Sequence, residues 1–325
     1  MKHEFLIIAD MHYSISGQMA EATWILKWFG GLFPKFARRC EQGAAIHIKE
    51  TLREAAEHGP YAAGIDLGDR THGSHKDTGL KTKHAADEAR GALQILKDVF
   101  NGLEFFLVPG NHDKGWHLSS FTRWGNGYLQ DSLTKYREIY GPLYGITSLT
   151  EEVNLIWLSS EPFFFDYKRS IRFGKGKREE KKSRERLQLL RSELAIQLDF
   201  VKNQLANVAN HDRKFILAVH EPSTLLSPQL QSILDEHRDR LIVTLTGHVH
   251  ARWLMNLLKL FRPALHRIFS RYKIQMIPSV WGIDLPVPGL AWGPGAGWAK
   301  LTIEDGRVML YIFHTNKRRF RGIRL

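Results

Sequence analysis

The sequence predicts an α/β fold in which two β-sheets pack together between layers of helices. Apolar runs of strand length alternate with helical patterns over the first two thirds of the 325 residues. After His250 the pattern becomes strand-rich, which indicates a second sheet. Several apolar runs stop in Gly or Ala and are followed by metal-binding residue types. In open α/β sheets the crevice beyond the carboxyl ends of the strands binds ligands, so we expect a site there.

Short apolar runs predict six strands in the first part of the chain, at Phe5–Ala9, Ala62–Asp66, Glu104–Val108, Val153–Leu158, Phe215–Val219 and Leu241–Leu245. Helical patterns lie between them, at Ile46–Glu57, Ala85–Val99 and Arg184–Val208. The last of these has apolar residues at helical spacing, namely Leu187, Leu190, Leu194, Leu198, Val201 and Leu205. The strand-rich tail predicts three more strands, at Ile274–Ile277, Trp298–Ile303 and Val308–Phe313. The turn Glu304-Asp305-Gly306 joins the last two as a hairpin.

The composition is that of a soluble globular protein, with 43% hydrophobic residues and a length sufficient to bury a substantial core. No apolar stretch approaches the roughly 18 to 20 residues that span a bilayer, and a strand begins where a signal peptide would lie. Cys40 is the single cysteine, so no internal disulfide can form, in agreement with a reducing compartment. We therefore expect a cytoplasmic protein.

The net charge of +12 is unevenly distributed. Lys168–Arg191 is a basic run relieved only by Glu179, Glu180 and Glu185, and Lys317–Arg324 is basic again. Such a field favours anionic partners, namely phosphate esters, nucleic acid or an acidic membrane surface. The alternative interpretation is that the charge only keeps the protein soluble.

Five short segments carry metal-ligating residue types: Asp10 with His12, Asp69, Asn111 with His112, His220, and His248 with His250. Carboxylate, imidazole and amide oxygen without thiolate suit Mn, Fe, Zn, Co or Ni better than a structural zinc, whose sites are usually rich in Cys. The ligands are too many for one ion. Two divalent ions about 3.5 to 4 Å apart, bridged by one carboxylate, would use them all and could generate a hydroxide that attacks a phosphoryl group.

Taken in order, the blocks Asp10-Met11-His12, Gly68-Asp69-Arg70, Gly110-Asn111-His112-Asp113, His220 and Gly247-His248-Val249-His250 resemble the five motifs of the calcineurin-like metallophosphoesterases. The resemblance covers most of the chain, which we expect to be a single domain over 1–325. It implies a four-layer α-β-β-α sandwich with mixed sheets and a dinuclear metal site at the strand ends.

The resemblance also implies roles for individual residues. One ion would be held by Asp10, His12 and His250, and the other by Asn111, His220 and His248, with Asp69 bridging the two. The cofactors would be two divalent ions, with Mn preferred and Fe, Zn, Co or Ni as alternatives. His112 is similar to the family histidine that hydrogen-bonds the phosphate and protonates the leaving oxygen, a role in which Asp113 could orient it.

Three departures from the family pattern concern substrate binding more than metal binding. Arg70 directly follows Asp69, and His72 stands where many relatives carry an acidic residue. Arg70 could clamp a substrate phosphate bidentately, or it could pair with Asp66. His72 is either a substrate contact or a structural residue beside the ligand loop. Val249 replaces a threonine found in many relatives, which removes a hydroxyl.

Two helical insertions, near 18–42 and 252–273, follow ligand segments and combine apolar, aromatic and basic residues. This composition is typical of a helix that enters an anionic membrane surface, although such helices can also pack on each other or on the sheet. In the membrane interpretation the substrate would be lipid-linked, as in the related UDP-diacylglucosamine pyrophosphohydrolases, and the protein would be peripherally membrane-bound.

The predicted function is therefore hydrolysis of a phosphoester or pyrophosphate bond through a metal-bridging hydroxide, with a lipid-linked substrate at a membrane surface as the leading hypothesis. One alternative is a nuclease or cyclic-nucleotide phosphodiesterase that uses the basic run Lys168–Arg191 as a nucleic-acid track. Another is a non-catalytic membrane-binding or interaction module. The complete ligand set argues against the latter. The loaded metals, the bond type cleaved and the oligomeric state stay open at this stage.

Overall fold

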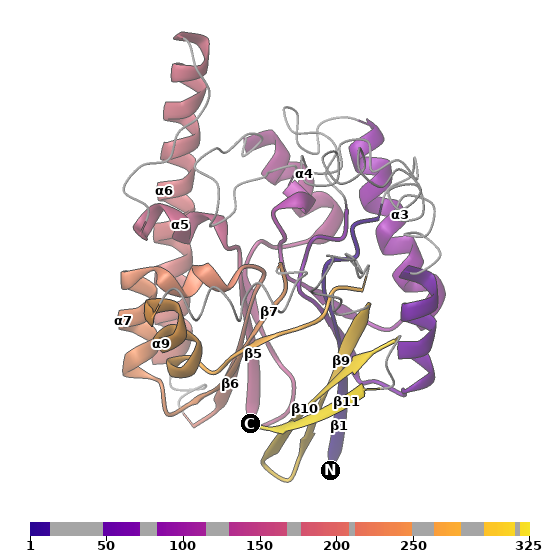
Figure 1. The fold of residues 1–325 in the computed structure, drawn as a ribbon. Helices are drawn as coiled ribbons and strands as arrows, with labels where there is room; N and C mark the ends of the chain where they lie inside the picture. The colour runs from indigo at the N-terminus through magenta and orange to yellow at the C-terminus, as the bar shows by residue number, and fades with distance from the viewer. Residues whose placement is uncertain are drawn as a thin grey trace, which may run out of the picture.

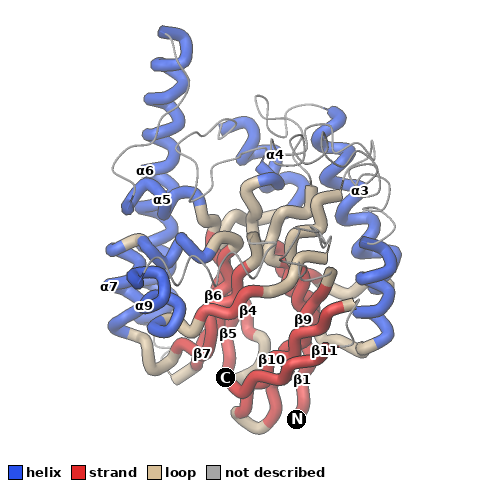
Figure 2. The backbone as a smooth tube through the Cα atoms, viewed as in Figure 1, coloured by secondary structure: helices blue, strands red, loops and turns tan. Residues whose placement is uncertain are grey.

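The computed structural model describes residues 1–13, 48–71, 83–114, 130–167, 177–207, 212–248, 263–280, 296–315 and 319–325. Two mixed β-sheets face each other, and helices cover their outer sides (Figures 1 and 2). The α/β sandwich predicted from the sequence is confirmed.

The first sheet has six strands in the order β11-β10-β9-β1-β2-β3. Its parallel part consists of β1 (Lys2–Ile8), β2 (Ala63–Asp66) and β3 (Phe105–Leu107). Its antiparallel part consists of β9 (Gly297–Glu304), β10 (Arg307–His314) and β11 (Arg319–Arg324). The predicted hairpin joins β9 and β10 through Asp305 and Gly306, whose positive φ angles of 48° and 71° suit a tight turn.

The second sheet has five strands in the order β4-β5-β6-β7-β8. Four of them are parallel: β5 (Val153–Leu158), β6 (Lys214–Val219), β7 (Leu241–Thr246) and β8 (Ile274–Met276). The edge strand β4 (Gly145–Ser148) runs antiparallel to β5. Strands buried on both faces read as continuous apolar runs, which is why β5, β6 and β7 were predictable from composition.

Helices form the outer layers. A helix over 48–57 and α3 (Lys83–Phe100) pack on the first sheet, where Ile48, Leu52 and Leu96 meet Leu6 and Ile8. The second sheet is covered by α5 (Glu161–Tyr167), α6 (Lys177–Ala206), α7 (Pro228–Glu236) and α9 (Pro263–Arg271). The remaining described elements are α4 (Gln130–Tyr140) and two 3-10 turns, η2 (His112–Lys114) and η4 (Pro222–Leu226).

The main core lies between the two sheets. Alternate residues of β1, among them Phe5 and Ile7, point inward to meet Leu155, Ile216 and Val243 of the second sheet. This packing holds the two sets of parallel strands side by side, so that their carboxyl ends open toward the same end of the molecule (Figure 1). The position of the site follows from that arrangement.

Part of the predicted insertion near 252–273 is a core element. Its described part, residues 263–273, contains α9, where Ile268 and Phe269 are 9% and 6% exposed. Together with the fully buried Tyr272 they pack against the apolar cluster under the second sheet. This outcome fits the sheet-packing alternative and not a membrane-facing helix. The insertion near 18–42 lies outside the described residues. Among the helices that are described, none has the length and apolar character of a membrane span.

Candidate metal centre

The predicted ligand residues lie just beyond the carboxyl ends of five strands. Asp10 and His12 follow β1, Asp69 follows β2, and Asn111 and His112 follow β3 in the first sheet. The second sheet contributes the two remaining described ligands, His220 after β6 and His248 after β7. His250 and the predicted substrate residue His72 lie outside the described residues.

The ligand loops have unusual backbone conformations. Asp10, His12, Asp69 and His248 all have positive φ angles, of 56°, 46°, 56° and 66°. Non-glycine residues adopt this conformation at a cost and keep it where the surroundings hold them. Here the loops hold each other, since His12 N donates to Asp69 O at 2.9 Å and His248 N donates to both carboxylate oxygens of Asp10 at 3.0 and 3.1 Å.

Glycine at position 68 is a steric requirement of the same loops. Its φ is +99°, and a side chain there would come within 2.5 Å of the Gly110 backbone nitrogen. The absence of a Cβ lets the loop after β2 lie against the loop after β3. Asp69 and Asn111 are thereby brought into one site.

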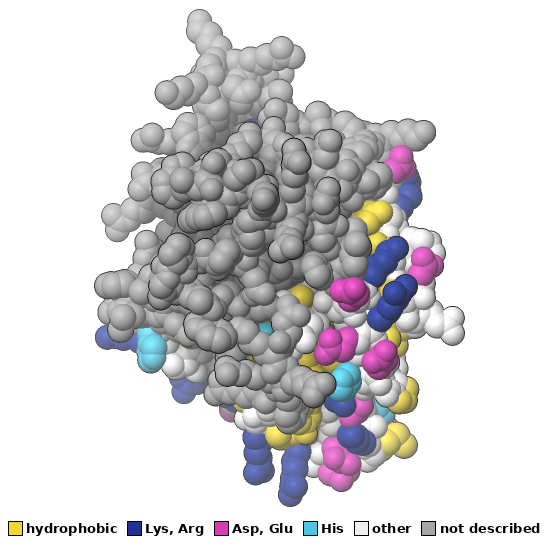
Figure 3. All heavy atoms as spheres, turned by 45° about the vertical axis from the view of Figure 1, so that its right-hand side comes forward, with side chains coloured by type: hydrophobic (Ala, Val, Ile, Leu, Met, Phe, Trp, Pro, Cys, Tyr) yellow, Lys and Arg dark blue, Asp and Glu magenta, His cyan; other side chains and the backbone are white. Residues whose placement is uncertain are grey.

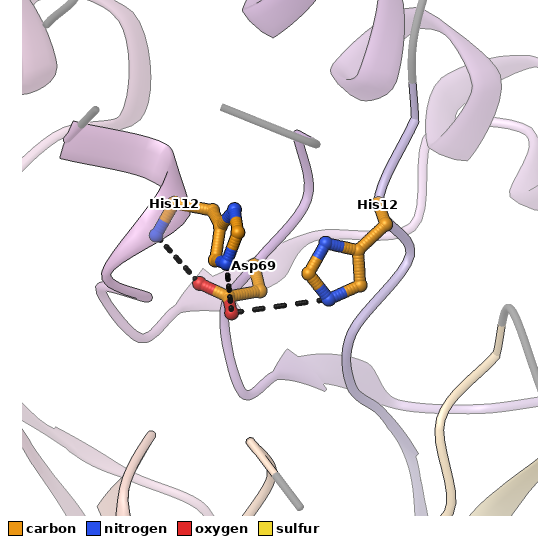
Figure 4. A group of neighbouring side chains, drawn as sticks. All are labelled: His12, Asp69 and His112. Carbon is orange, nitrogen blue, oxygen red and sulfur yellow. Dashed lines mark hydrogen bonds and ion pairs between the residues drawn. The ribbon is translucent and has the colours of Figure 1, made fainter. Parts of the chain in front are cut away.

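Asp69 occupies the centre of the ligand group and is 1% exposed. Its Oδ1 accepts a hydrogen bond from the backbone N–H of His112 at 2.8 Å. Its Oδ2 lies 3.9 Å from Nε2 of His12 and 3.9 Å from Nε2 of His112 (Figure 4). The same oxygen is 3.0 Å from Nε2 of His220. One carboxylate thus faces imidazoles from three different loops.

On one side of Asp69, four potential ligand atoms converge. Nε2 of His220 lies 3.1 Å from Oδ1 of Asn111, 3.1 Å from Nδ1 of His248 and 3.0 Å from Oδ2 of Asp69. Nδ1 of His220 is 2.8 Å from the carbonyl oxygen of Leu67, so we assign the ring proton to Nδ1. In that tautomer Nε2 presents a lone pair to the lone pairs of the neighbouring ligand atoms, and either a proton on Nε2 or a metal ion among these atoms relieves the repulsion.

The spacing fits a divalent ion. Ligand atoms about 2.1 Å from an octahedral metal ion and at right angles to each other lie about 3 Å apart, and the observed separations are 3.0 to 3.1 Å. The hydrogen bond from His220 to Leu67 is the outer contact that commonly orients a metal-binding histidine. The residues present therefore fit a metal ion.

A second group shares Asp69 with the first. The ligand atoms of His12, Asp69 and His112 lie within 4.8 Å of one another, as do those of Asp69, His220 and His248. A carboxylate common to both groups is the arrangement that a bridging ligand requires. In the described part of the chain, His112 belongs to this second group together with His12, and their rings meet edge to face at 4.8 Å.

The charges of the site are strongly coupled. Burial raises the pKa of Asp10 to about 8, partly opposed by His220 and reinforced by Asp69. Burial and the neighbouring His220 lower the pKa of His248 to about 3, which keeps that imidazole neutral and able to bind a metal. Burial also tends to lower the pKa of His220, but the charge of Asp69 outweighs it and raises the pKa to about 10. Without a cation, the cluster therefore takes up a proton at His220.

Arg70 is placed beneath the site and not at its opening. Its side chain is fully buried, with Nε 2.9 Å from Oδ2 of Asp66 and Nη1 2.7 Å from Oδ2 of Asp113. Nη2 donates to the carbonyl oxygen of Val108 at 3.0 Å. Of the two roles considered for Arg70, this geometry fits the pairing with Asp66 and leaves no guanidinium surface for a substrate.

Asp113 organises backbone. Its carboxylate oxygens accept hydrogen bonds from the N–H groups of Gly110 at 3.0 Å, Asp69 at 3.0 Å and Arg70 at 2.7 Å. The carboxylate thus joins the loop after β2 to the loop after β3. It influences the position of the neighbouring His112 through these backbone contacts. The sequence analysis assigned Asp113 only to the orientation of His112 and missed these backbone contacts, two of which join segments 43 or 44 positions apart.

Comparison with known proteins agrees with this geometry. The family model for calcineurin-like phosphoesterases matches residues 3–252. No curated protein matches the sequence.

Among solved structures, a predicted phosphoesterase from Streptococcus pneumoniae TIGR4 aligns over 100% of this chain and 99% of its own, at 10% identity and a TM-score of 0.34. The D62A mutant of Vps29 from Entamoeba histolytica aligns over 99% and 98%, at 11% identity and a TM-score of 0.34. Vacuolar Protein Sorting 29 from Cryptosporidium parvum aligns over 100% and 97%, at 10% identity and a TM-score of 0.36. These TM-scores are too low to inform function. The match to the family over most of the chain, together with the clustered ligands, shows that the chain belongs to the calcineurin-like phosphoesterases.

Proposed function

We propose that this protein hydrolyses a phosphoester or pyrophosphate bond with the help of two divalent metal ions. The family supports metal-dependent phosphoesterase chemistry in general. The observation that carries the proposal is the clustering of ligand atoms from Asp69, Asn111 and His248, each of which lies 3.0 to 3.1 Å from Nε2 of His220. These are oxygen and imidazole ligand atoms of the types that divalent ions bind, gathered from four separate loops.

The residues divide into two ligand sets. We propose that Asn111, His220 and His248 hold one ion, that Asp10, His12 and His250 hold the other, and that Asp69 bridges them. When bound, the ions supply a hydroxide nucleophile and stabilise negative charge on the phosphoryl group. Manganese is our first choice of metal, because oxygen and imidazole ligands without thiolate suit it. We also propose that the protein acts in the cytoplasm.

His112 is the proposed general acid. Its side chain is 19% exposed, compared with 5% for His12, 13% for His248 and 1% for His220, so it is the most accessible imidazole of the described group. Its backbone is fixed by Asp69 Oδ1 at 2.8 Å. A partly exposed imidazole beside the ligand group can donate a proton to a leaving oxygen. Its position near Asp69 would also suit a metal ligand, and the variants proposed below separate the two roles.

Asp113 and Arg70 are proposed as positioning residues. Asp113 accepts hydrogen bonds from the backbone of Asp69 and of Gly110, which precedes Asn111, and Arg70 neutralises the carboxylates of Asp113 and Asp66. Neither side chain is exposed. Their contribution to catalysis is therefore the placement of ligands and of His112, which a shift of about 1 Å would impair.

The substrate class is a separate proposal. Burial of Ile268, Phe269 and Tyr272 removes part of the motivation for a lipid-linked substrate at a membrane. The nucleic-acid alternative has one favourable observation, because α6 begins at Lys177 within the basic run and extends well beyond the rest of the fold (Figure 1). On the face that carries α3, by contrast, basic and acidic side chains are interleaved over the described residues (Figure 3). This face therefore offers no continuous basic track for a nucleic-acid backbone.

A substrate screen tests these proposals. Metal-free protein should be inactive on nitrophenyl monoester and diester substrates, and manganese should restore turnover. The same loaded protein is then offered single-stranded DNA, cyclic nucleotides and phosphatidic acid vesicles. Activity that is equal with and without metal, under conditions where Asp69→Asn is also fully active, would contradict the proposed mechanism.

A further inference from the structure

Glu221 directly follows His220 and is the N-cap residue of the turn η4. It is 1% exposed, and no feature of the sequence pointed to it as part of the site. Its carboxylate has a defined orientation, because Oε1 accepts a hydrogen bond from the Ser223 hydroxyl at 2.6 Å. Its backbone N–H donates to Ser160 Oγ at 3.0 Å, which fixes the residue at its base. The other oxygen, Oε2, lies 3.7 Å from Nε2 of His248.

The two nitrogens of His248 therefore face different surroundings. Nδ1 faces the ligand cluster, at 3.1 Å from Nε2 of His220. Nε2 faces the carboxylate of Glu221. A cation bound at Nδ1 requires a lone pair there, which leaves the ring proton on Nε2, on the side of Glu221. Binding of the cation also makes that N–H more positive, so its attraction to a carboxylate increases.

We propose that Glu221 is a positioning residue that holds His248 as a metal ligand through its Nε2 edge, with Ser223 orienting the carboxylate. A carboxylate at the distal nitrogen fixes the tautomer and the plane of a metal-bound imidazole and makes it a stronger ligand. The inference rests on the proposed function, and it adds that the ion held by Asn111, His220 and His248 depends on Glu221. The other ion, on the side of Asp10 and His12, does not.

Cobalt binding to the full chain tests this inference. Glu221→Gln keeps the shape of the side chain and removes its charge, and Ser223→Ala keeps the charge and removes the hydroxyl that orients it. Glu193→Gln is the matched control, since Glu193 is 6% exposed and pairs with Arg137 at 2.8 Å in another part of the fold. Metal-free protein is titrated with Co²⁺, and both the heat of binding and the visible absorption of bound cobalt are recorded.

We expect Glu221→Gln to lower the affinity for one of the two cobalt ions by about 10- to 100-fold and to leave the affinity for the other near that of the wild type. The absorption of the weakened ion should change shape, and Ser223→Ala should give a smaller effect in the same direction. Glu193→Gln should match the wild type in both readouts. If Glu221→Gln does not fold, Ser223→Ala alone decides the outcome.

Three results would count against the inference. Unchanged affinity for both ions in Glu221→Gln and Ser223→Ala would overturn the role of Glu221 while leaving the proposed function intact. Equal weakening of both ions, with a lower melting temperature of the metal-free protein, would make Glu221 a general structural residue. Wild-type protein that binds no cobalt would overturn the proposed function itself and the inference with it.

Discussion

Replacing Arg70 with methionine perturbs the centre of the structure beneath the metal site. Arg70, Asp66 and Asp113 are all fully buried, and the guanidinium contacts the two carboxylates at 2.9 and 2.7 Å. Methionine fills similar space but supplies no charge and no N–H. Two carboxylates would then be buried without their cation. Removing one partner from a buried ion pair costs about 3 to 5 kcal/mol, which is a large share of the roughly 5 to 15 kcal/mol that stabilises a typical domain.

The cost should depend on pH. Burial raises the pKa of Asp66 to about 6, although Arg70 acts to lower it. A carboxyl whose pKa is higher in the folded than in the unfolded protein binds more protons when folded, so stability falls as the pH rises between the two values. Without Arg70 the pKa of Asp66 in the folded protein rises further. The pH range over which the stability falls then extends above pH 6. The loss of unfolding free energy in Arg70→Met should therefore be larger at about pH 8 than at about pH 5.

Urea unfolding of metal-free protein at both pH values measures this directly. Arg90→Met is the matched control, because Arg90 is 58% exposed and forms a surface pair with Asp87. It should lose no more than about 1 kcal/mol. Adding Asp66→Asn to Arg70→Met should recover part of the loss at the higher pH. Equal losses in Arg70→Met and Arg90→Met, or a loss that is larger at low pH, would refute the reasoning.

Four further variants test other parts of the molecule. Asn111→Ala should reduce metal occupancy, whereas His112→Ala should keep its metal and slow turnover by about a hundredfold or more. The slowing should be smallest for substrates whose leaving group needs no proton. Comparable metal loss in both variants would reassign His112 as a ligand. Lys114→Met should destabilise the fold by about 3 to 5 kcal/mol in urea unfolding, because the fully buried Lys114 pairs with Glu161 at 2.6 Å. A loss of unfolding free energy smaller than that from removing an exposed lysine from its ion pair would argue against this stabilising role. Phe269→Ser should lower the melting temperature, since Phe269 is 6% exposed, and a stable variant that instead lost binding to anionic vesicles would restore the membrane interpretation.

The strands were predictable where burial imposes a simple pattern. Strands β5, β6 and β7 are buried along almost their whole length, so their sequences are continuous apolar runs. The short edge strand β4 and the basic edge strand β11 lack such a pattern, because an edge strand need not bury both faces. Helix α4 was also missed, since its buried residues Tyr136 and Tyr140 are amphipathic and stand among charged neighbours.

The site, like the fold, has parts that could be predicted from the sequence and parts that could not. Its candidate ligands could be predicted because each follows an apolar run and carries a metal-binding side chain. The contacts around them depend on approaches between distant segments that no local pattern encodes. Arg70 meets Asp113 across 43 positions, and Ser160 meets Glu221 across 61. A sequence shows that these groups exist, but only the packing of the two sheets shows that they touch.

Counting metal ions tests the central claim most directly. Wild-type protein is loaded with manganese, freed of unbound metal and analysed for its elements, alongside Asp69→Asn. Because Asp69 lies in both ligand groups, the account predicts about two ions per wild-type chain and weaker binding of both in Asp69→Asn. At most one ion per wild-type chain, or an Asp69→Asn variant that loses a single ion and keeps the other at full affinity, would contradict it.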